Sequence, residues 1–466
     1  MTLCRSQHQS VSPKRTPDFY DQDSNPSALS PRPPGSLGAE EFSGVGKLAF
    51  ASLWLLVFTI PWEDAITIPS FGTSARLIGM VSGGLGVLAI IERGRVRRPA
   101  PGHILMTLFV LLAAISYMWS LYPEGTLTQA STYFQLLMMV WLIWELATGS
   151  REQIRLMQAY VLGTFVSGID TVYLSISHQE SAYQRYAGGG LNADDLGLIM
   201  ALSIPVSYYL LIHNKGPMAW VYRLQLALAG TAILLSAARG SFLAVVVALS
   251  IVPWTYGRLS WQKRIAILLT ASLLVCGALV FVPSTSWERL STIPNEFTQG
   301  TLTGRTIIWK AGWEVFREHP FLGVGANSFR VMVSRVLTIP INMASLGVTP
   351  VAHNTFLSVL VEQGIIGFAL FCSLLGVLAL SLRAMPAFPR KLWIVCSAVW
   401  IVGVSSLTWE IRKPTWFFFG LLLAQCGSIA QKRPAQSHAL RFDRSLKGST
   451  SDSLGPQSSI GFTQHC

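Results

Sequence analysis

The chain has 466 residues, of which 51% are apolar and only 12% are charged. Soluble domains carry about 25% charged residues, so this composition excludes a soluble globular protein and a disordered chain. The formal net charge is +12, and its position along the chain decides whether it indicates membrane topology or nucleic-acid binding. The composition therefore predicts a membrane protein.

Polar segments without periodicity stand at both ends of the chain. Residues 1–46 and 431–466 are rich in serine, proline and glutamine. Such segments bury too little apolar surface to offset the entropy lost on folding. We expect two disordered tails, one before and one after a membrane domain that comprises residues 47–430.

Apolar runs long enough to cross a bilayer, which takes about 20 residues, recur throughout residues 47–430. They predict an all-α, polytopic helical membrane protein with about 12 transmembrane helices. The expected spans are 47–62, 76–92, 103–120, 130–148, 156–176, 194–212, 218–237, 241–256, 265–283, 354–382, 391–409 and 415–430. Only Ala238-Arg239-Gly240 separates the seventh span from the eighth, and the tenth is long enough to tilt or to extend beyond the bilayer.

Basic residues are concentrated in alternate loops. If the first span begins in the cytoplasm, fourteen lie in the cytoplasmic loops: Arg93, Arg95, Arg97, Arg98, Arg151, Arg155, Lys215, Arg223, Arg258, Lys263, Arg264, Arg383, Arg390 and Lys391. The short outer loops hold Arg185, Arg239, Arg412 and Lys413, with Arg76 at the edge of a span. This bias follows the positive-inside rule and predicts that both termini are cytoplasmic. The positive charge thus indicates topology, and no nucleic-acid partner is expected.

One outer connection, residues 284–350, is too long to be a simple turn. Apolar residues recur at helical spacing in 304–319 and 325–339, and Trp309 and Trp313 flank the first of these stripes. Tryptophan and amphipathic helices both favour the membrane interface. We expect a large helical periplasmic loop that covers the outer mouth of the bundle.

Three arginines and a histidine are predicted at this outer face. Arg185 precedes a run of glycines, Arg305 begins the first cap helix, and His353 begins the tenth span. On residue pattern alone, each has an ordinary interpretation, as a loop charge, a helix flank and an interfacial histidine. Arg239 is a functional candidate by default, because a charge in so short a turn costs several kcal/mol unless it is paired or hydrated.

Together, these four residues favour phosphate chemistry. Guanidinium groups bind phosphate oxygens bidentately, and the N–H groups of a helix that begins near Arg305 would add to an anion site. Histidine is well suited to take a proton from a sugar hydroxyl near neutral pH. A diphosphate leaves as a stable anion whose charge arginines can absorb, so we expect neither a metal nor another cofactor.

A metal-dependent nucleotide-sugar transferase is disfavoured. The D-x-D spacing of its metal site occurs only at Asp21 and Asp23, within the expected N-terminal tail.

The candidate residues stand in stretches that resemble the O-antigen ligase and polysaccharide polymerase family of bacterial inner-membrane glycosyltransferases. These stretches read ARGSFLA at 238–244, GRTIIW at 304–309, HPFLGVGANSF at 319–329, and HNTFL at 353–357 followed by EQGIIG at 362–367. Their order and spacing around one large outer loop also resemble the family. The resemblance covers about residues 185–375.

This resemblance implies a transferase of surface polysaccharide biosynthesis in the inner membrane. Its donor would be a glycan linked to a polyprenyl diphosphate such as undecaprenyl diphosphate, and its acceptor would be a glycan hydroxyl. Other polysaccharide assembly proteins and the lipid bilayer would be its further partners. The resemblance also implies that the diphosphate is bound by Arg239 and Arg305, with Arg185 beside them, and that His353 is catalytic.

The same resemblance places Asn192 and Asn354 along the cleft. The chain departs from the family at Asn192-Ala193-Asp194-Asp195, where Asp194 and Asp195 are interpreted as acids that favour the N-terminus of the sixth span. Gly323 and Gly325 indicate either a tight loop turn or a close approach to a ligand. Glu362 either pairs with an arginine or forms hydrogen bonds within the bundle.

Three acceptors fit the family: the growing chain (polymerase), a lipid A core (ligase) or a protein side chain. The GRTIIW form and the basic C-terminal tail favour an exopolysaccharide or O-antigen polymerase. A glycolipid transporter or flippase is the alternative, although no internal repeat is found and the polar residues lie at the outer surface rather than at the midplane. A noncatalytic membrane scaffold would not need His353 opposite several arginines.

Overall fold

The structure is a computed structural model that describes residues 44–69, 72–177, 185–214, 216–257, 259–282, 284–291, 304–338 and 350–430. The description concerns the unit Phe42–Cys466. The tails expected at 1–46 and 431–466 lie almost wholly outside the described residues.

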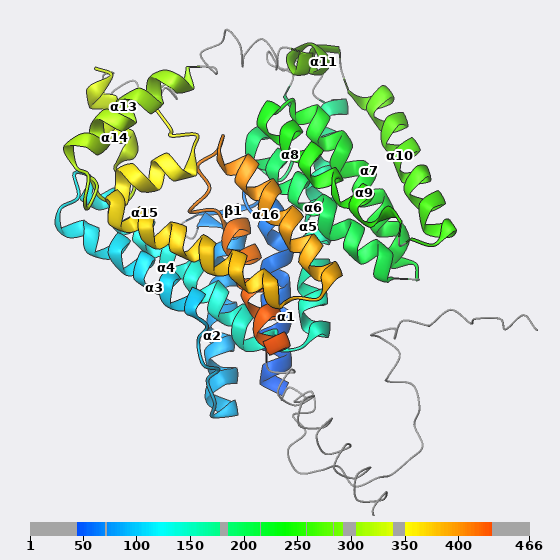
Figure 1. The fold of residues 1–466 in the computed structure, drawn as a ribbon, viewed down its shortest axis with the longest axis horizontal. Coiled ribbons are helices and arrows are strands. Elements are labelled where there is room, and N and C mark those ends of the chain that lie inside the picture. The colour runs from blue at the N-terminus through cyan, green and yellow to red at the C-terminus, as the bar shows by residue number, and fades with distance from the viewer. Residues whose placement is uncertain are drawn as a thin grey trace, which may run out of the picture. The chain divides into compact units, whose positions relative to one another are not determined.

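Most described residues are helical, which confirms the all-α prediction (Figure 1). The helices before the large loop are α1 (Gly44–Thr59), η1 (Ile60–Trp62), α2 (Ser74–Arg93), α3 (Pro101–Ile115), η2 (Ser116–Met118), α4 (Pro123–Leu146), α5 (Ser150–Ser177), α6 (Ala193–His213), α7 (Met218–Ser236), α8 (Arg239–Leu249), α9 (Ile251–Tyr256) and α10 (Trp261–Phe281). The rest are α11 (Ser284–Ser291), α13 (Arg305–Glu318), α14 (Phe329–Val336), α15 (Thr355–Ser381), η4 (Leu382–Ala384), α16 (Ala387–Val404) and a last helix at 413–430. The strands β1 (Thr67–Ile68) and β2 (Gly72–Thr73) form one short antiparallel pair.

Each of the twelve expected spans corresponds to helical structure. Among the described residues, nine helices or helix pairs are long and apolar enough to cross a membrane. The other three expected spans fall on α4, α10 and the helix at 413–430. The span expected at 391–409 is wrong at its end, because α16 stops at Val404 and the chain continues as a loop to residue 412.

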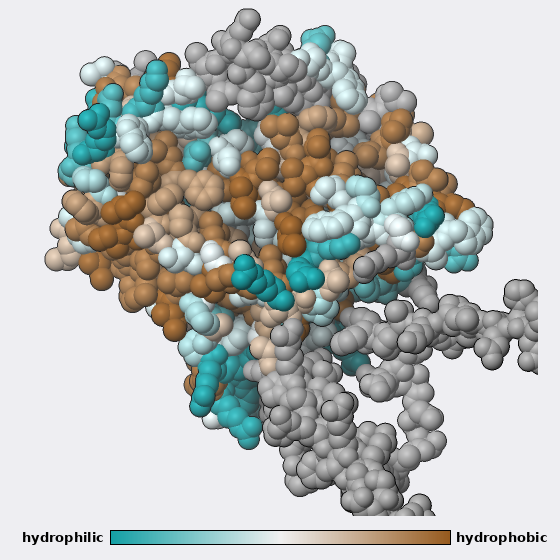
Figure 2. Space-filling model, in the orientation of Figure 1, coloured by the Kyte–Doolittle hydropathy of each residue, from teal (hydrophilic) through white to brown (hydrophobic). Residues whose placement is uncertain are grey.

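The central helix of the bundle is α6, whose side chains are buried along almost its whole length. It packs against α5, α7, α8 and α16. On the face shown in Figure 2, apolar residues form a broad band across the helices, and hydrophilic residues gather above and below it. This band is the surface that a bilayer would cover.

The two stripes predicted in the long loop are the amphipathic helices α13 and α14. Together with the connection 319–328 they are called the cap, and they lie beside one end of α15 (Figure 1). Val315, Phe329 and Val333 are buried against Val361 of α15. The indole N–H of Trp309 donates a hydrogen bond to the Ala352 carbonyl at 2.8 Å, which ties α13 to the segment that leads into α15.

Helix α15 is broken at Gly364, where φ is 63° and ψ is −167°. The tenth expected span therefore contains a kink, which the sequence did not predict. The cap connection enters the break: the Ile365 N–H donates to the Pro320 carbonyl at 2.8 Å, and the Val324 N–H donates to the Val361 carbonyl at 3.1 Å. A Cβ atom on Gly364 would collide with the Phe321 carbonyl, so the close approach requires glycine here.

Candidate functional site

The N-terminal end of α6 is held in place by the residues at its start. Asn192 is the N-cap, and its Oδ1 accepts a hydrogen bond from the Asp195 N–H at 2.8 Å. Its Nδ2 donates to Asp195 Oδ2 at 2.7 Å. Both ends of the Asn192 amide thus bind its own helix, and the residue holds the helix terminus in place.

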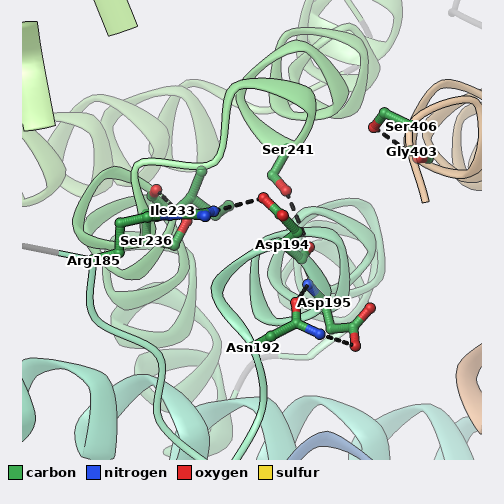
Figure 3. A network of polar contacts seen from close by, with 9 residues as sticks. All are labelled: Arg185, Asn192, Asp194, Asp195, Ile233, Ser236, Ser241, Gly403 and Ser406. Carbon is green, nitrogen blue, oxygen red and sulfur yellow. Dashed lines mark hydrogen bonds and ion pairs between the residues drawn. The ribbon is translucent and has the colours of Figure 1, made fainter. Parts of the chain in front are cut away.

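Arg185 links the start of α6 to the end of α7. Its Nη2 donates to Asp194 Oδ1 at 2.6 Å, and its Nε donates to the Ser236 carbonyl at 3.0 Å (Figure 3). The Ser241 hydroxyl of α8 donates to the Asp194 backbone carbonyl at 3.4 Å. Three helices therefore meet around this ion pair.

Arg239 and Arg305 each stand at the first turn of a helix. Between α7 and α8, Ala237 takes the left-handed conformation with φ 46°, so the chain reverses within two residues and α8 begins at Arg239. Gly304, with φ 80°, precedes α13, which begins at Arg305. Positive φ before each arginine is what allows so abrupt a helix start.

The three arginines belong to one electrostatic cluster. Burial lowers the pKa of the Arg305 guanidinium, the charge of Asp194 raises this pKa, and the charges of Arg185 and Arg239 lower it. The loop before α6, the α7–α8 turn and the start of α13 thus bring together residues that are far apart in the sequence. An anion near them would receive charge-assisted hydrogen bonds from several directions.

His353 lies in the same cluster. Burial lowers the pKa of its imidazole from the usual 6.5, the charge of Arg305 lowers it further, and Asp194 and Asp195 raise it. The imidazole is therefore uncharged at neutral pH and can accept a proton. Its φ of 43° is uncommon for a non-glycine residue, and such strained backbone occurs most often at functional sites.

Asn354 fixes the residue that precedes it. It is the N-cap of α15, and its Oδ1 accepts a hydrogen bond from the Leu357 N–H at 3.0 Å. Its Nδ2 donates to the Ser405 carbonyl at 3.3 Å. Like Asn192, it holds a helix terminus beside the cluster.

Two acids that were interpreted only as helix-terminal charges have specific partners. Asp194 pairs with Arg185, whereas Asp195 is buried and pairs with Arg412. Asp195 Oδ1 also accepts a hydrogen bond from Trp409 Nε1 at 2.6 Å. Trp409 and Arg412 both follow α16, more than 200 residues away, so no local sequence signal could have predicted these two contacts.

Glu362 and the loop glycines support the cap. Glu362 Oε2 accepts a hydrogen bond from Gln129 at 2.9 Å, and among the described residues it forms no ion pair with an arginine. Its backbone carbonyl accepts a hydrogen bond from the Gly325 N–H at 2.9 Å. Gly323 and Gly325 both have positive φ. A Cβ atom would collide with the Glu362 backbone at Gly323 and with Ser120 at Gly325, so both glycines allow close packing of the loop.

The cluster can bind an oxyanion and accept a proton. Three guanidinium groups offer fixed positive charge, and His353 offers a neutral base beside them. Partial burial of these side chains strengthens each of these interactions, because the local dielectric constant is lower than that of water.

Comparison with known proteins finds one family that part of the chain resembles. Residues 224–372 match the family model described as O-antigen ligase. The matched segment contains Arg239, Arg305 and His353, whereas Arg185 and Asn192 precede it. No curated protein matches the chain.

Proposed function

We propose that the protein is a glycosyltransferase of surface polysaccharide biosynthesis. The match of residues 224–372 to the family model described as O-antigen ligase supports this function. The protein moves a glycan from a polyprenyl-diphosphate carrier to an acceptor hydroxyl at the inner membrane. The observation that carries this proposal is the cluster of Arg185, Arg239 and Arg305 with His353, whose pKa is lowered by burial and by Arg305.

The arginines hold the donor diphosphate. The carrier's polyprenyl chain lies in the bilayer, so its diphosphate stays at the membrane surface, at the level of helix termini such as those of α8 and α15. A guanidinium group binds two phosphate oxygens at once and keeps its charge, which suits a leaving group that gains negative charge.

His353 takes the acceptor proton. The acceptor oxygen attacks the anomeric carbon of the donor sugar, and a new carbon–oxygen bond forms. The bond between that carbon and the diphosphate oxygen breaks, and its electron pair leaves with the diphosphate. The hydroxyl proton passes to the imidazole of His353, which is uncharged because burial and Arg305 hold its pKa below the usual value.

The acceptor is the end of a growing glycan, which makes the protein a polymerase. The GRTIIW stretch at the start of α13 and the basic C-terminal tail support this choice over a ligase. The reaction takes place on the periplasmic side with both termini in the cytoplasm, as the fourteen basic residues of the alternate loops indicate.

A glycan profile of a deletion strain tests this function. Lipid-linked and finished glycans are separated by size, with wild-type complementation as the control. Loss of long chains with single repeat units left on the carrier is the expected result. Long chains that accumulate on the carrier would instead indicate a ligase, and an unchanged carrier-linked pool with failed export would indicate a transporter.

A further inference from the structure

A carboxylate lies inside the cluster that is proposed to bind the anionic donor. Asp194 Oδ1 accepts a 2.6 Å hydrogen bond from Arg185 Nη2, and the backbone of Asp194 is held by the Ser241 hydroxyl at 3.4 Å (Figure 3). The side chain is 29% exposed, so the oxygens of a ligand can approach it. An anion-binding site does not need such a group for attraction, because a carboxylate repels phosphate.

The charge of Asp194 acts on the rest of the cluster. Its negative charge raises the pKa of Arg305 and the pKa of His353. The charge of Asp195 also raises the pKa of His353, whereas the charge of Arg305 lowers it. Asp195 itself differs from Asp194 because it is buried and its charge is balanced by Arg412. Asp194 is thus the carboxylate that shares a guanidinium with the proposed ligand.

The charge balance follows from these contacts. Three guanidinium groups and the Asp194 carboxylate leave an excess of positive charge that matches a bound sugar diphosphate, which has one ionised oxygen on each phosphorus. After transfer, the carrier diphosphate has a further ionisable oxygen. Three arginines without a counter-charge would therefore bind the product more tightly than the donor, and product release would slow turnover.

We propose that Asp194 is a counter-charge that competes with the carrier diphosphate for Arg185 and so promotes release of that product. This inference rests on the proposed function. When the product forms, its diphosphate and the carboxylate share the same guanidinium. Repulsion between the diphosphate and the carboxylate makes the product bind more weakly than it would at a site without Asp194.

Product binding to the purified full-length protein in nanodiscs tests the inference. The probe is undecaprenyl diphosphate, and the proteins are wild type, Asp194→Asn and Asp194→Glu. Asparagine keeps an oxygen that accepts the Arg185 hydrogen bond, so this variant loses mainly the charge. We expect Asp194→Asn to bind the probe roughly tenfold more tightly and Asp194→Glu to bind it as wild type does, with the difference shrinking as salt rises.

Asp170→Asn is the matched control. Asp170 Oδ2 accepts a 2.7 Å hydrogen bond from the Gly189 N–H in the loop that also carries Arg185, but its charge is not among those that shift the pKa of Arg305 or His353. The Asp170→Asn variant should bind the probe as wild type does.

In steady state, Asp194→Asn should lower KM and kcat together. A merely structural defect would not do so, because such a defect weakens binding.

Unchanged or weaker probe binding by Asp194→Asn would overturn the inference and leave the proposed function standing. If the wild-type protein itself fails to bind undecaprenyl diphosphate, the proposed function fails, and the inference falls with it.

Discussion

His353 combines a strained backbone with an uncharged side chain. Its φ of 43° is maintained on one side by the Asn354 cap of α15 and on the other by the Trp309 hydrogen bond to Ala352. The sequence indicated His353, Arg185, Arg239 and Arg305 as candidates, because all four are predicted at the outer face, in or beside stretches that resemble one family. It could not indicate the pairing of Asp194 with Arg185 or of Asp195 with Arg412, because pairing depends on tertiary contacts.

The pH dependence of transfer tests the surroundings of His353. The unprotonated imidazole is the active form, and its pKa lies below 6.5, so kcat/KM should fall only on the acid side of that value. Arg305→Gln removes a positive neighbour, which raises the pKa and moves the acid limb to higher pH. Asp194→Asn removes a negative neighbour, which lowers the pKa and moves the limb to lower pH. Shifts in the same direction would contradict this account.

At the scale of elements, apolar runs predicted the helices and helical spacing predicted α13 and α14. The break in α15 was not predicted, because apolar runs stand on both sides of Gly364 and only the docked cap connection reveals its role. The end of α16 was missed for a related reason. Leu407 and Trp409 have the composition of a span, but they lie in a loop whose Trp409 side chain is buried against Asp195.

Gly364→Ala should release the cap from α15. The alanine would be strained at φ 63° and would collide with the Phe321 carbonyl, at a cost of about 1–3 kcal/mol. Gly376→Ala on the same helix is the control, because nothing lies within 4 Å of its added Cβ atom. Thermal unfolding in detergent and limited proteolysis of the cap should show a loss for Gly364→Ala and none for Gly376→Ala. Equal stability of the two variants would be inconsistent with the docked connection.

At the scale of the whole molecule, the site forms where the cap, the central helix α6 and the α7–α8 turn meet. The composition and the recurring apolar runs were enough to predict a polytopic helical protein. The meeting of these elements could be inferred only through family resemblance, because a single sequence does not specify how helices pack. The family match now supports that resemblance over residues 224–372.

Transfer should proceed without a divalent metal ion. The proposed site stabilises the leaving diphosphate with guanidinium groups, which a chelator does not remove. The purified protein should therefore keep its full transfer rate after dialysis against EDTA. A rate that collapses in EDTA and returns only on addition of a divalent ion would count against the arginine-based mechanism.

The most direct test of the account measures binding and transfer in the same His353→Ala preparation, with purified protein in nanodiscs and a lipid-linked glycan donor. The arginines that hold the diphosphate are untouched, so donor binding should stay within about threefold of wild type. Loss of the general base should slow transfer by about 10²–10⁴-fold. Transfer at the wild-type rate by a folded His353→Ala protein would contradict the central claim that this histidine accepts the proton.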